Sequence, residues 1–330
     1  NLYPALWHKA SRDVMDELFG DERLKSVLSA QWGYYGSPPS RSSFGMHAML
    51  AKHYRNGGSY PVGGGRSFAD AIVPIIESAG GMVLYGAEVE EILVEGGRTR
   101  GVRLRSGEEI ASPLVVSNAG VHNSFTRMMR PEVADAAGMG ALVLEIPEAY
   151  TGVGLNVGLR GTAAELGFPG TNVWAHPGND FEANLVEHRG NFHAPFPWTF
   201  TTFPSAKDPS WDASYPGRST VEMYGYTDYR HFERWAGTRW MKRGEDYLRR
   251  KAEIEARLLD ELYRHAPGAR GAVDCVEVST PLTYETFARR RRGGFMGIEA
   301  SPKRFRQQWL RATTPIKGFF LTGQDVSTDG

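Results

Sequence analysis

Two short apolar runs that lie far apart in the chain constrain its fold more than any other feature. Residues 114–116 read Leu-Val-Val, residues 316–321 read Ile-Lys-Gly-Phe-Phe-Leu, and a polar turn follows each run. A run without a polar face is typical of a strand that is buried on both sides, as in a parallel sheet covered by helices. We therefore expect both runs to belong to an α/β domain, with a mixed α+β region between them.

The segment 61–120 predicts a helix, a strand, a hairpin and the first buried strand, in that order. Apolar residues recur at helical spacing between Phe68 and Ile76. Residues 82–85 are apolar and predict a strand. Residues 89–94 and 101–105 flank a Gly-Gly turn, which is the pattern of a β-hairpin.

The rest of the chain predicts a helical N-terminal part and a mixed central part. Alternating apolar residues at 153–157 and 196–200 predict strands. Residues 245–265 predict a long charged helix, which Pro267-Gly268 ends. We divide the chain into a helical part (1–60), a first α/β piece (61–120), a mixed part (121–314) and a second α/β piece (315–330).

Composition excludes several classes of protein. The chain has 38 Lys+Arg and 38 Asp+Glu, so it lacks the positive field that nucleic-acid binding needs. Its one cysteine, Cys275, excludes an internal disulfide and a cysteine-rich metal site, and its apolar strand predicts a buried thiol. His188 and His193 lack the spacing of a metal site, so we expect no bound metal.

The two ends and the hydropathy bear on location. No run of about 18 apolar residues is present, and the first residues do not form a signal peptide. We expect a cytoplasmic protein with at most peripheral membrane contact. The chain stops directly after a strand and a turn, where a domain rarely ends, so we expect an internal segment of a longer protein.

Three further features each have two interpretations. The arginines at 289–292 form either a solvated loop or a site for an anionic group. A stretch with Trp235, Trp240 and Met241 is flanked by Arg234, Arg239, Lys242 and Arg243, and it either covers the start of a helix or touches a membrane interface. The aromatic residues between 192 and 203 form either ordinary core or the wall of an apolar pocket.

Five blocks of sequence carry a more specific pattern. They are His53-Tyr54 with Ser59-Tyr60-Pro61-Val62-Gly63-Gly64; Gly80-Gly81 with Val89-Glu90-Glu91-Ile92; Gly101-Val102-Arg103-Leu104 with Val115-Val116-Ser117-Asn118-Ala119; Thr280-Pro281-Leu282-Thr283 with Gly297; and Thr314-Pro315-Ile316-Lys317-Gly318-Phe319-Phe320-Leu321-Thr322-Gly323-Gln324-Asp325. Together they resemble the FAD-dependent family that includes phytoene desaturases, carotenoid isomerases and retinol saturases. The last block is most similar to the retinol saturase and carotenoid isomerase branch, and the resemblance covers most of the chain.

The resemblance implies an FAD-binding, Rossmann-like domain built from three separate pieces, of which 61–120 is the middle piece, 315–330 is the C-terminal piece, and the N-terminal glycine-loop piece is not in this sequence. It also implies that 1–60 is a helical part of the substrate domain and that 121–314 is the rest of that domain. It implies that the backbone at Val89 faces the adenine and that Asp325 lies beside the ribityl chain. Without the glycine loop, we expect this chain alone to bind FAD poorly. The residues expected at the cofactor are Gly63, Gly64, Val89, Asn118, Ala119, Gly323, Gln324 and Asp325.

The resemblance also implies a reaction at carbon–carbon bonds of an apolar polyene or isoprenoid, in the direction of saturation, desaturation or isomerisation. The alternatives are a flavin amine oxidase and a flavin- or lipid-binding protein without turnover. The expected partner is an apolar small molecule, and the oligomeric state is left open. Candidate catalytic residues are His53 and Tyr284, and candidate pocket walls are Tyr60, Trp198, Phe200 and Phe295.

Overall fold

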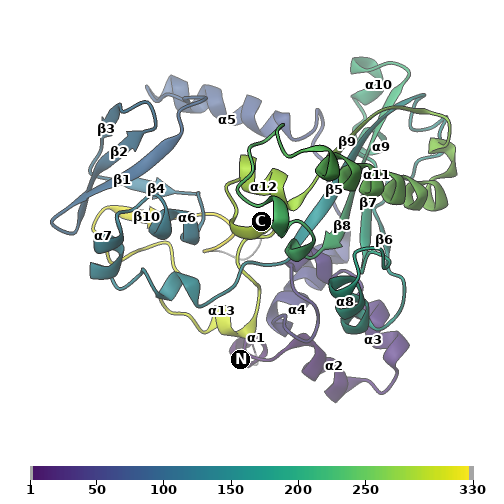
Figure 1. The fold of residues 1–330 in the computed structure, drawn as a ribbon, viewed down its shortest axis with the longest axis horizontal. Coiled ribbons are helices and arrows are strands. Elements are labelled where there is room, and N and C mark those ends of the chain that lie inside the picture. The colour runs from purple at the N-terminus through teal and green to yellow at the C-terminus, as the bar shows by residue number, and fades with distance from the viewer. Residues whose placement is uncertain (1–2, 327–330) are drawn as a thin grey trace.

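A computed structural model describes residues 3–326, which form two lobes side by side (Figure 1). One lobe holds an antiparallel sheet of β1 (Val89–Glu95), β2 (Arg98–Leu104) and β3 (Glu109–Ala111). Beside it, β4 (Val115–Ser117) and β10 (Phe319–Leu321) pair in parallel. The two apolar runs that are far apart in the sequence therefore lie next to each other.

The hairpin β1–β2 follows from its turn. Gly96 and Gly97 both have positive φ, 57° and 71°. A type I′ turn requires positive φ at both of its central residues, and its twist matches that of the two strands it joins. The N–H of Thr99 in β2 donates to the carbonyl of Lys317 at 3.0 Å. The hairpin sheet is thus tied to the segment that leads into β10.

The helices after β4 complete the core of this lobe. They are α6 (Val121–Thr126), α7 (Pro131–Ala136) and the 3₁₀ turn η3 (Leu142–Leu144). Phe125 packs edge-on against Phe319 of β10, with ring centroids 5.7 Å apart. The same core contains Ile92, Val94, Val121, Met129, Ala134, Met139, Val143, Ile146, Ile298, Ile316 and Leu321.

Two sequence-based expectations in this lobe are wrong. Residues 82–85 form no strand, and Met82, Leu84 and Tyr85 are exposed. β4 is not buried on both sides, because Val116 is exposed and β10 is its only partner strand among residues 3–326. A strand needs neighbours for its backbone groups, and the described residues offer none at 82–85 and only one beside β4.

The other lobe is built on a five-stranded antiparallel sheet in the order β6-β7-β8-β5-β9. Its strands are β5 (Thr151–Arg160), β6 (Val173–Ala175), β7 (Thr199–Thr202), β8 (Arg218–Thr227) and β9 (Val273–Ser279). The strand predicted at 196–200 begins only at Thr199. Cys275 on β9 is exposed, so the prediction of a buried thiol is also wrong.

One face of this sheet is covered by the long helix α11 (Glu245–His265), whose bounds match the prediction. Ile254, Leu258 and Leu262 of the helix share a closed hydrophobic core with Val153 and Leu155 of β5. The observed architecture confirms the expected α/β class with a mixed second part.

The remaining helices lie around and between the lobes (Figure 1). None of the described helices is long and apolar enough to span a bilayer. Their bounds are α1 (Tyr3–Trp7), α2 (Ser11–Leu18), α3 (Glu22–Ser29), η1 (Trp32–Tyr35), α4 (Phe44–His53), η2 (Tyr54–Asn56), α5 (Arg66–Ser78), α8 (Phe181–Gly190), α9 (Pro204–Lys207), α10 (Trp211–Ser214), η4 (Tyr229–His231), η5 (Glu233–Trp235), η6 (Pro267–Ala269), α12 (Pro281–Phe287), η7 (Arg291–Gly293) and α13 (Pro302–Phe305).

Candidate functional site

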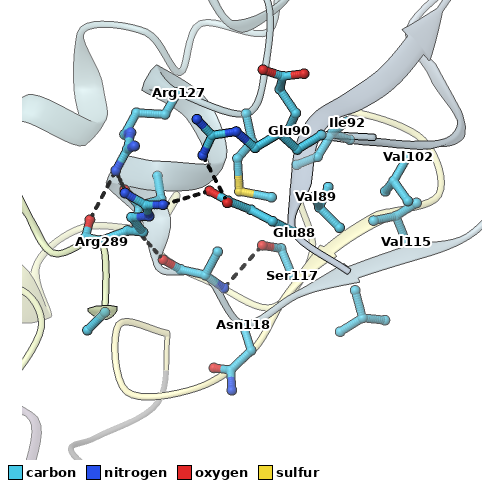
Figure 2. Close-up of a pocket in the computed structure, with 16 residues that line it drawn as sticks. Glu88, Val89, Glu90, Ile92, Val102, Val115, Ser117, Asn118, Arg127 and Arg289 are labelled. Atoms are coloured by element: carbon cyan, nitrogen blue, oxygen red, sulfur yellow. Dashed lines mark hydrogen bonds and ion pairs between the residues drawn. The ribbon is translucent and has the colours of Figure 1, made fainter. Parts of the chain in front are cut away.

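A cavity of about 640 Å³ opens between β1, β2, β4 and the loop after α12. Figure 2 shows apolar side chains of Val89, Val102 and Val115 on one side and Arg127 and Arg289 on the other. The cavity therefore has an apolar wall and a basic wall. It is lined by Glu88, Val89, Glu90, Ile92, Val102, Arg105, Val115, Val116, Ser117, Asn118, Ala119, Asn123, Arg127, Met128, Ala288 and Arg289.

A carboxylate and two arginines join the two lobes at the rim of this cavity. Glu88 accepts from Arg105 at 3.1 Å and from Arg289 at 3.0 Å. The guanidinium of Arg105, together with that of Arg289, lowers the pKa of Glu88. Arg127 donates to the backbone carbonyl of Arg289 at 3.3 Å. The loop after α12 is thereby held against the lobe that contains β1 to β4.

The polar turn after β4 is held in one conformation by short hydrogen bonds. The hydroxyls of Ser117 and Ser124 are 2.8 Å apart, and the N–H of Ala119 donates to the Ser117 hydroxyl at 3.3 Å. The amide of Asn123 donates to the carbonyl of Ala119 at 2.9 Å. This turn exposes Asn118 and Ala119 to the cavity.

The turn after β10 lies against the turn after β4. Gly323 has φ +88°, and a Cβ atom there would lie 1.9 Å from Oδ1 of Asn118. Only glycine allows this approach and this backbone conformation together. Gln324 follows, and its side chain packs beside Gly297. Residues near 118 and near 323, expected from the sequence to share a site, are in direct contact.

Asp325 is almost fully buried and links three segments. One carboxylate oxygen accepts from the N–H of Val121 at 2.9 Å, and the other accepts from the N–H of Ile298 at 3.1 Å. Arg290 lies 3.5 Å from the same carboxylate. Gly120 is needed here, because a Cβ atom would meet both Arg290 and Asp325 at less than 3 Å. The carboxylate therefore fixes the junction between the two lobes.

The second face of the five-stranded sheet, opposite α11, is built from glycines and aromatic rings. β5 presents Gly152 and Gly154 on this face, because their neighbours Val153 and Leu155 point into the core. A Cβ atom at Gly154 would lie 3.2 Å from the hydroxyl of Tyr284. We call this surface the aromatic face; its rings are Phe200, Tyr224, Tyr284 and Phe295, in contact in the order Phe200–Tyr224–Phe295–Tyr284.

Two tyrosines on the aromatic face have perturbed hydroxyls. The Tyr284 hydroxyl is buried and has no hydrogen-bond partner within residues 3–326. Burial, with the nearby Tyr224 as a smaller cause, raises the pKa of Tyr284. Burial and the neighbouring Glu222 raise the pKa of Tyr224 to about 12. Both groups therefore keep their protons at neutral pH.

The other predicted site residues lie in different surroundings. Gly63 is not among the residues that line the cavity; its N–H donates to Asp208 at 3.1 Å, and Gly64 follows directly. Tyr60 lies under the ammonium of Lys207, 5.9 Å from its ring centre. His53 is exposed at the end of α4.

Trp198 also belongs to a packed region rather than to a wall. It is fully buried and contacts Trp32 and Tyr150 edge-on. Trp174 links it to Phe200 at the border of the aromatic face. Trp198 therefore supports that face from behind.

Sequence reasoning missed three contributors to these surfaces. Arg290 was grouped with its neighbours, although it alone of the four arginines reaches Asp325. Tyr224 was not singled out, and Gly154 was interpreted only as part of a strand. The signal for the glycines is present in the sequence, since Gly152, Gly154 and Gly158 alternate with apolar residues and so share one face of β5.

No protein-family model matches the chain. It is 33% identical over 332 residues to all-trans-retinol 13,14-reductase of Homo sapiens, a match that covers 96% of this chain and 54% of that protein. A neurosporene-forming phytoene desaturase of Cereibacter sphaeroides is 39% identical over 112 residues, covering 33% of this chain and 21% of that protein. The chain thus spans about half the length (54%) of the retinol reductases that it matches.

Solved structures support the same assignment of the fold. An oxidoreductase from Methanosarcina mazei superposes with a TM-score of 0.64 at 17% identity, over 98% of this chain and 64% of that one. A putrescine oxidase superposes with a TM-score of 0.60 at 10% identity, over the whole of this chain and 65% of that one. The chain is therefore similar in sequence to all-trans-retinol 13,14-reductases, phytoene desaturases and a prolycopene isomerase, and it shares its fold with oxidoreductases of known structure.

Proposed function

We propose that this chain is a large part of an FAD-dependent oxidoreductase that acts on carbon–carbon double bonds of an apolar polyene or isoprenoid. Its relatives are named for reactions of retinol, phytoene and prolycopene. The observation that carries the proposal is the contact of Gly323 with Asn118 beside the cavity that Val89 lines. Three segments that the family uses for its cofactor meet there.

The donor set around the cavity fits the adenosine and ribityl parts of FAD. Val89, Val102 and Val115 offer an apolar wall for a flat ring, and Asn118 offers an amide for hydroxyl groups. Arg127 and Arg289 supply positive charge beside it. Gly323 allows the close backbone approach that a dinucleotide needs. Gly63 and Gly64 stay candidates for contact with the cofactor, although they do not line this cavity.

The chain's own part in the reaction is to bind an apolar substrate, exclude water and hold a proton. Bound FAD would supply the hydride chemistry at a substrate carbon. The aromatic face offers an apolar surface for a polyene, and the absence of a side chain at Gly154 lets the rings of Tyr284 and Tyr224 pack directly over β5. The Tyr284 hydroxyl is protonated at neutral pH and has no other partner among the described residues, so it is our candidate donor of the proton that the second carbon takes up during saturation. His53 and Tyr60 stay candidates at the outer end of the same region.

Anaerobic single-turnover assays of the full-length holoprotein test this function. The dithionite-reduced protein is mixed with all-trans-retinol, and we expect a product that is heavier by two hydrogen atoms. The oxidised protein is given putrescine and spermidine in parallel, and we expect no amine oxidation. Turnover of an amine without any change in polyenes would overturn the proposal in favour of an amine oxidase. A yellow protein that changes neither substrate class would favour a binding role.

Retention of the cofactor gives a readout that does not depend on turnover. We expect Gly323→Ala to lose FAD during gel filtration, because the added Cβ would collide with Asn118. Gly57→Ala is the matched control, since Gly57 has the same φ of +88° but no atom within 4 Å of an added Cβ. Equal FAD content in the two variants would show that the turn at Gly323 does not contact the cofactor.

A further inference from the structure

We infer that the loop 236–244 and the end of α12 dock on a bilayer that contains anionic lipid. We call this surface the loop patch; its members are Arg239, Trp240, Met241, Lys242 and Phe287. The inference rests on the proposed function, because an enzyme for long polyenes must take its substrate from a lipid phase. The geometry of the loop patch and its charges carry it.

The loop patch presents large apolar side chains to solvent at the tip of a turn. Trp240 is 50% exposed, Met241 80% and Phe287 63%. The N–H of Lys242 donates to the carbonyl of Arg239 at 3.0 Å, so Trp240 and Met241 are the two central residues of a tight turn. Trp240 also packs edge-on against Phe287, with ring centroids 5.2 Å apart. The three side chains therefore form one projecting group.

The backbone of this turn stores strain. Met241 has φ +63°, a conformation that favours glycine and costs about 1 kcal/mol or more for another residue. A glycine would fold more easily at this position, yet a flexible apolar side chain stands there. A methionine in this conformation is explained if its side chain makes a functional contact outside the folded core.

The charges around the tip select the bilayer over other occupants. Arg239 and Lys242 flank the apolar pair and have no ion-pair partner among the described residues. The nearest carboxylates along the chain are engaged: Asp246 pairs with Arg234, and Glu245 lies 3.9 Å from Arg249. An aromatic and a thioether side chain between two free cations match the interface of an anionic membrane.

A second exposed apolar surface lacks this charge pattern. α5 also exposes Phe68, Ile72 and Ile75, but its one arginine, Arg66, pairs with Asp70. Its apolar face is therefore not accompanied by a free cation. Charge complementarity with anionic lipid favours the loop patch.

The loop patch is also connected to the aromatic face by one short helix. α12 carries Phe287 at its exposed end and Tyr284 one turn earlier, where it packs on Phe295. Arg243 ties the loop to this helix by donating to the carbonyl of Leu282 at 3.2 Å and to the hydroxyl of Thr286 at 2.9 Å. A membrane at the loop patch would thus lie next to the surface proposed for the polyene.

Vesicle sedimentation of the full-length holoprotein tests the apolar part. The probes are phosphatidylcholine vesicles with and without phosphatidylserine. We expect the double variant Trp240→Ser with Met241→Gly to lower the vesicle-binding constant by at least about tenfold, because two apolar side chains no longer enter the interface. Met241→Gly removes the unfavourable φ, so this variant should fold at least as well as the parent. The control is Leu18→Ser with Val186→Ser, which removes side chains that are 62% and 69% exposed on α2 and α8.

The same assay tests the charges. Arg239→Gln and Lys242→Gln each remove one positive charge. Each should weaken binding to phosphatidylserine vesicles by about fivefold and leave binding to neutral vesicles unchanged. The effect should vanish at about 1 M salt, where charges are screened. Arg23→Gln, an exposed cation on α3, is the control. Unchanged vesicle binding in both loop variants, or an equal loss in the controls, would overturn the inference.

Turnover separates this inference from the proposed function. With retinol delivered from cyclodextrin, the loop variants should keep the parent's rate, whereas with retinol in vesicles they should be slower. A protein that binds vesicles through the loop but turns over no polyene would leave docking intact and remove the proposed function. A protein that turns over retinol, and takes it from vesicles equally well with and without the loop residues, would leave the proposed function intact and overturn docking.

Discussion

The two faces of the five-stranded sheet are made from the same strands but serve different ends. On one face, Val153 and Leu155 of β5 and Val221 and Met223 of β8 are fully buried under α11. On the other face, β5 offers only glycines at 152 and 154, and β8 offers Tyr224, beside partly buried rings. The alternation of a β-strand allows both patterns in one segment. Both faces are therefore packed, but the first is closed by the residues under α11, whereas the second packs aromatic rings over glycines and holds the unpaired hydroxyl of Tyr284.

The first prediction concerns the face of the sheet that is closed by α11. Leu155→Ala should lower the free energy of unfolding by about 3–4 kcal/mol, because it opens a cavity under α11 where the packing cannot collapse. Urea unfolding followed by circular dichroism measures this loss. Asn156→Ala changes the next residue of the same strand, which is exposed, and should cost no more than about 0.5 kcal/mol. Equal losses at the two positions would mean that the faces do not differ as described.

The second prediction concerns a titratable group at the end of the aromatic face. His188 of α8 is fully buried, packs on Tyr226, and its Nδ1 lies 3.2 Å from the carbonyl of Pro195. Burial lowers the pKa of His188 to about 4. Because the folded-state pKa lies below the unfolded value of about 6.5, this group stabilises the fold above pH 6.5, and that stability is lost as the pH falls towards 4.

The expected loss across this window is about 2–3 kcal/mol. Urea midpoints measured between pH 7 and pH 4 should fall for the parent and fall less steeply for His188→Gln. His193→Gln replaces an exposed histidine in the following loop and should leave the slope as it is in the parent. If the slope were the same in all three proteins, acid sensitivity would not originate at the end of the aromatic face.

Elements with local signals were predictable from the sequence. The helix α11 was placed at both ends, since its apolar residues recur at helical spacing and Pro267 follows it. The hairpin β1–β2 was placed because Gly96-Gly97 needs positive φ. The contact between Asn118 and Gly323 was expected only through the family resemblance, because no local pattern reports on residues so far apart.

The sequence-based predictions were wrong where a residue's environment depends on segments that are far away in the sequence. Residues 82–85 have the apolar composition of a strand but no described neighbour with which to pair. The four arginines at 289–292 look alike in the sequence, yet Arg289 has φ +54° and Arg292 φ +50°. These two left-handed backbone conformations send neighbouring side chains in different directions. Arg289 reaches the cavity rim, Arg290 reaches Asp325, and Arg292 reaches Glu233. Charge composition alone could not separate them.

The last prediction has the smallest effect on stability and sharpens the difference between the faces. Tyr284→Phe removes a buried hydroxyl that has no partner within the described residues, so the free energy of unfolding should change by no more than about 1 kcal/mol. Turnover of a polyene by the holoprotein should nevertheless fall by about a hundredfold or more, as expected for loss of a general acid.

Retention of FAD distinguishes a role in chemistry from a role in packing. Tyr284→Phe should bind FAD and substrate as the parent does, so its loss should appear in kcat and not in KM. Tyr215→Phe changes an exposed hydroxyl on the same lobe and should leave both constants unchanged. If Tyr284→Phe kept the parent's kcat, the unpaired hydroxyl would be a consequence of the crowded aromatic rings, and the proton for saturation would have to come from another group on this face, of which Tyr224 with its raised pKa is the next to test.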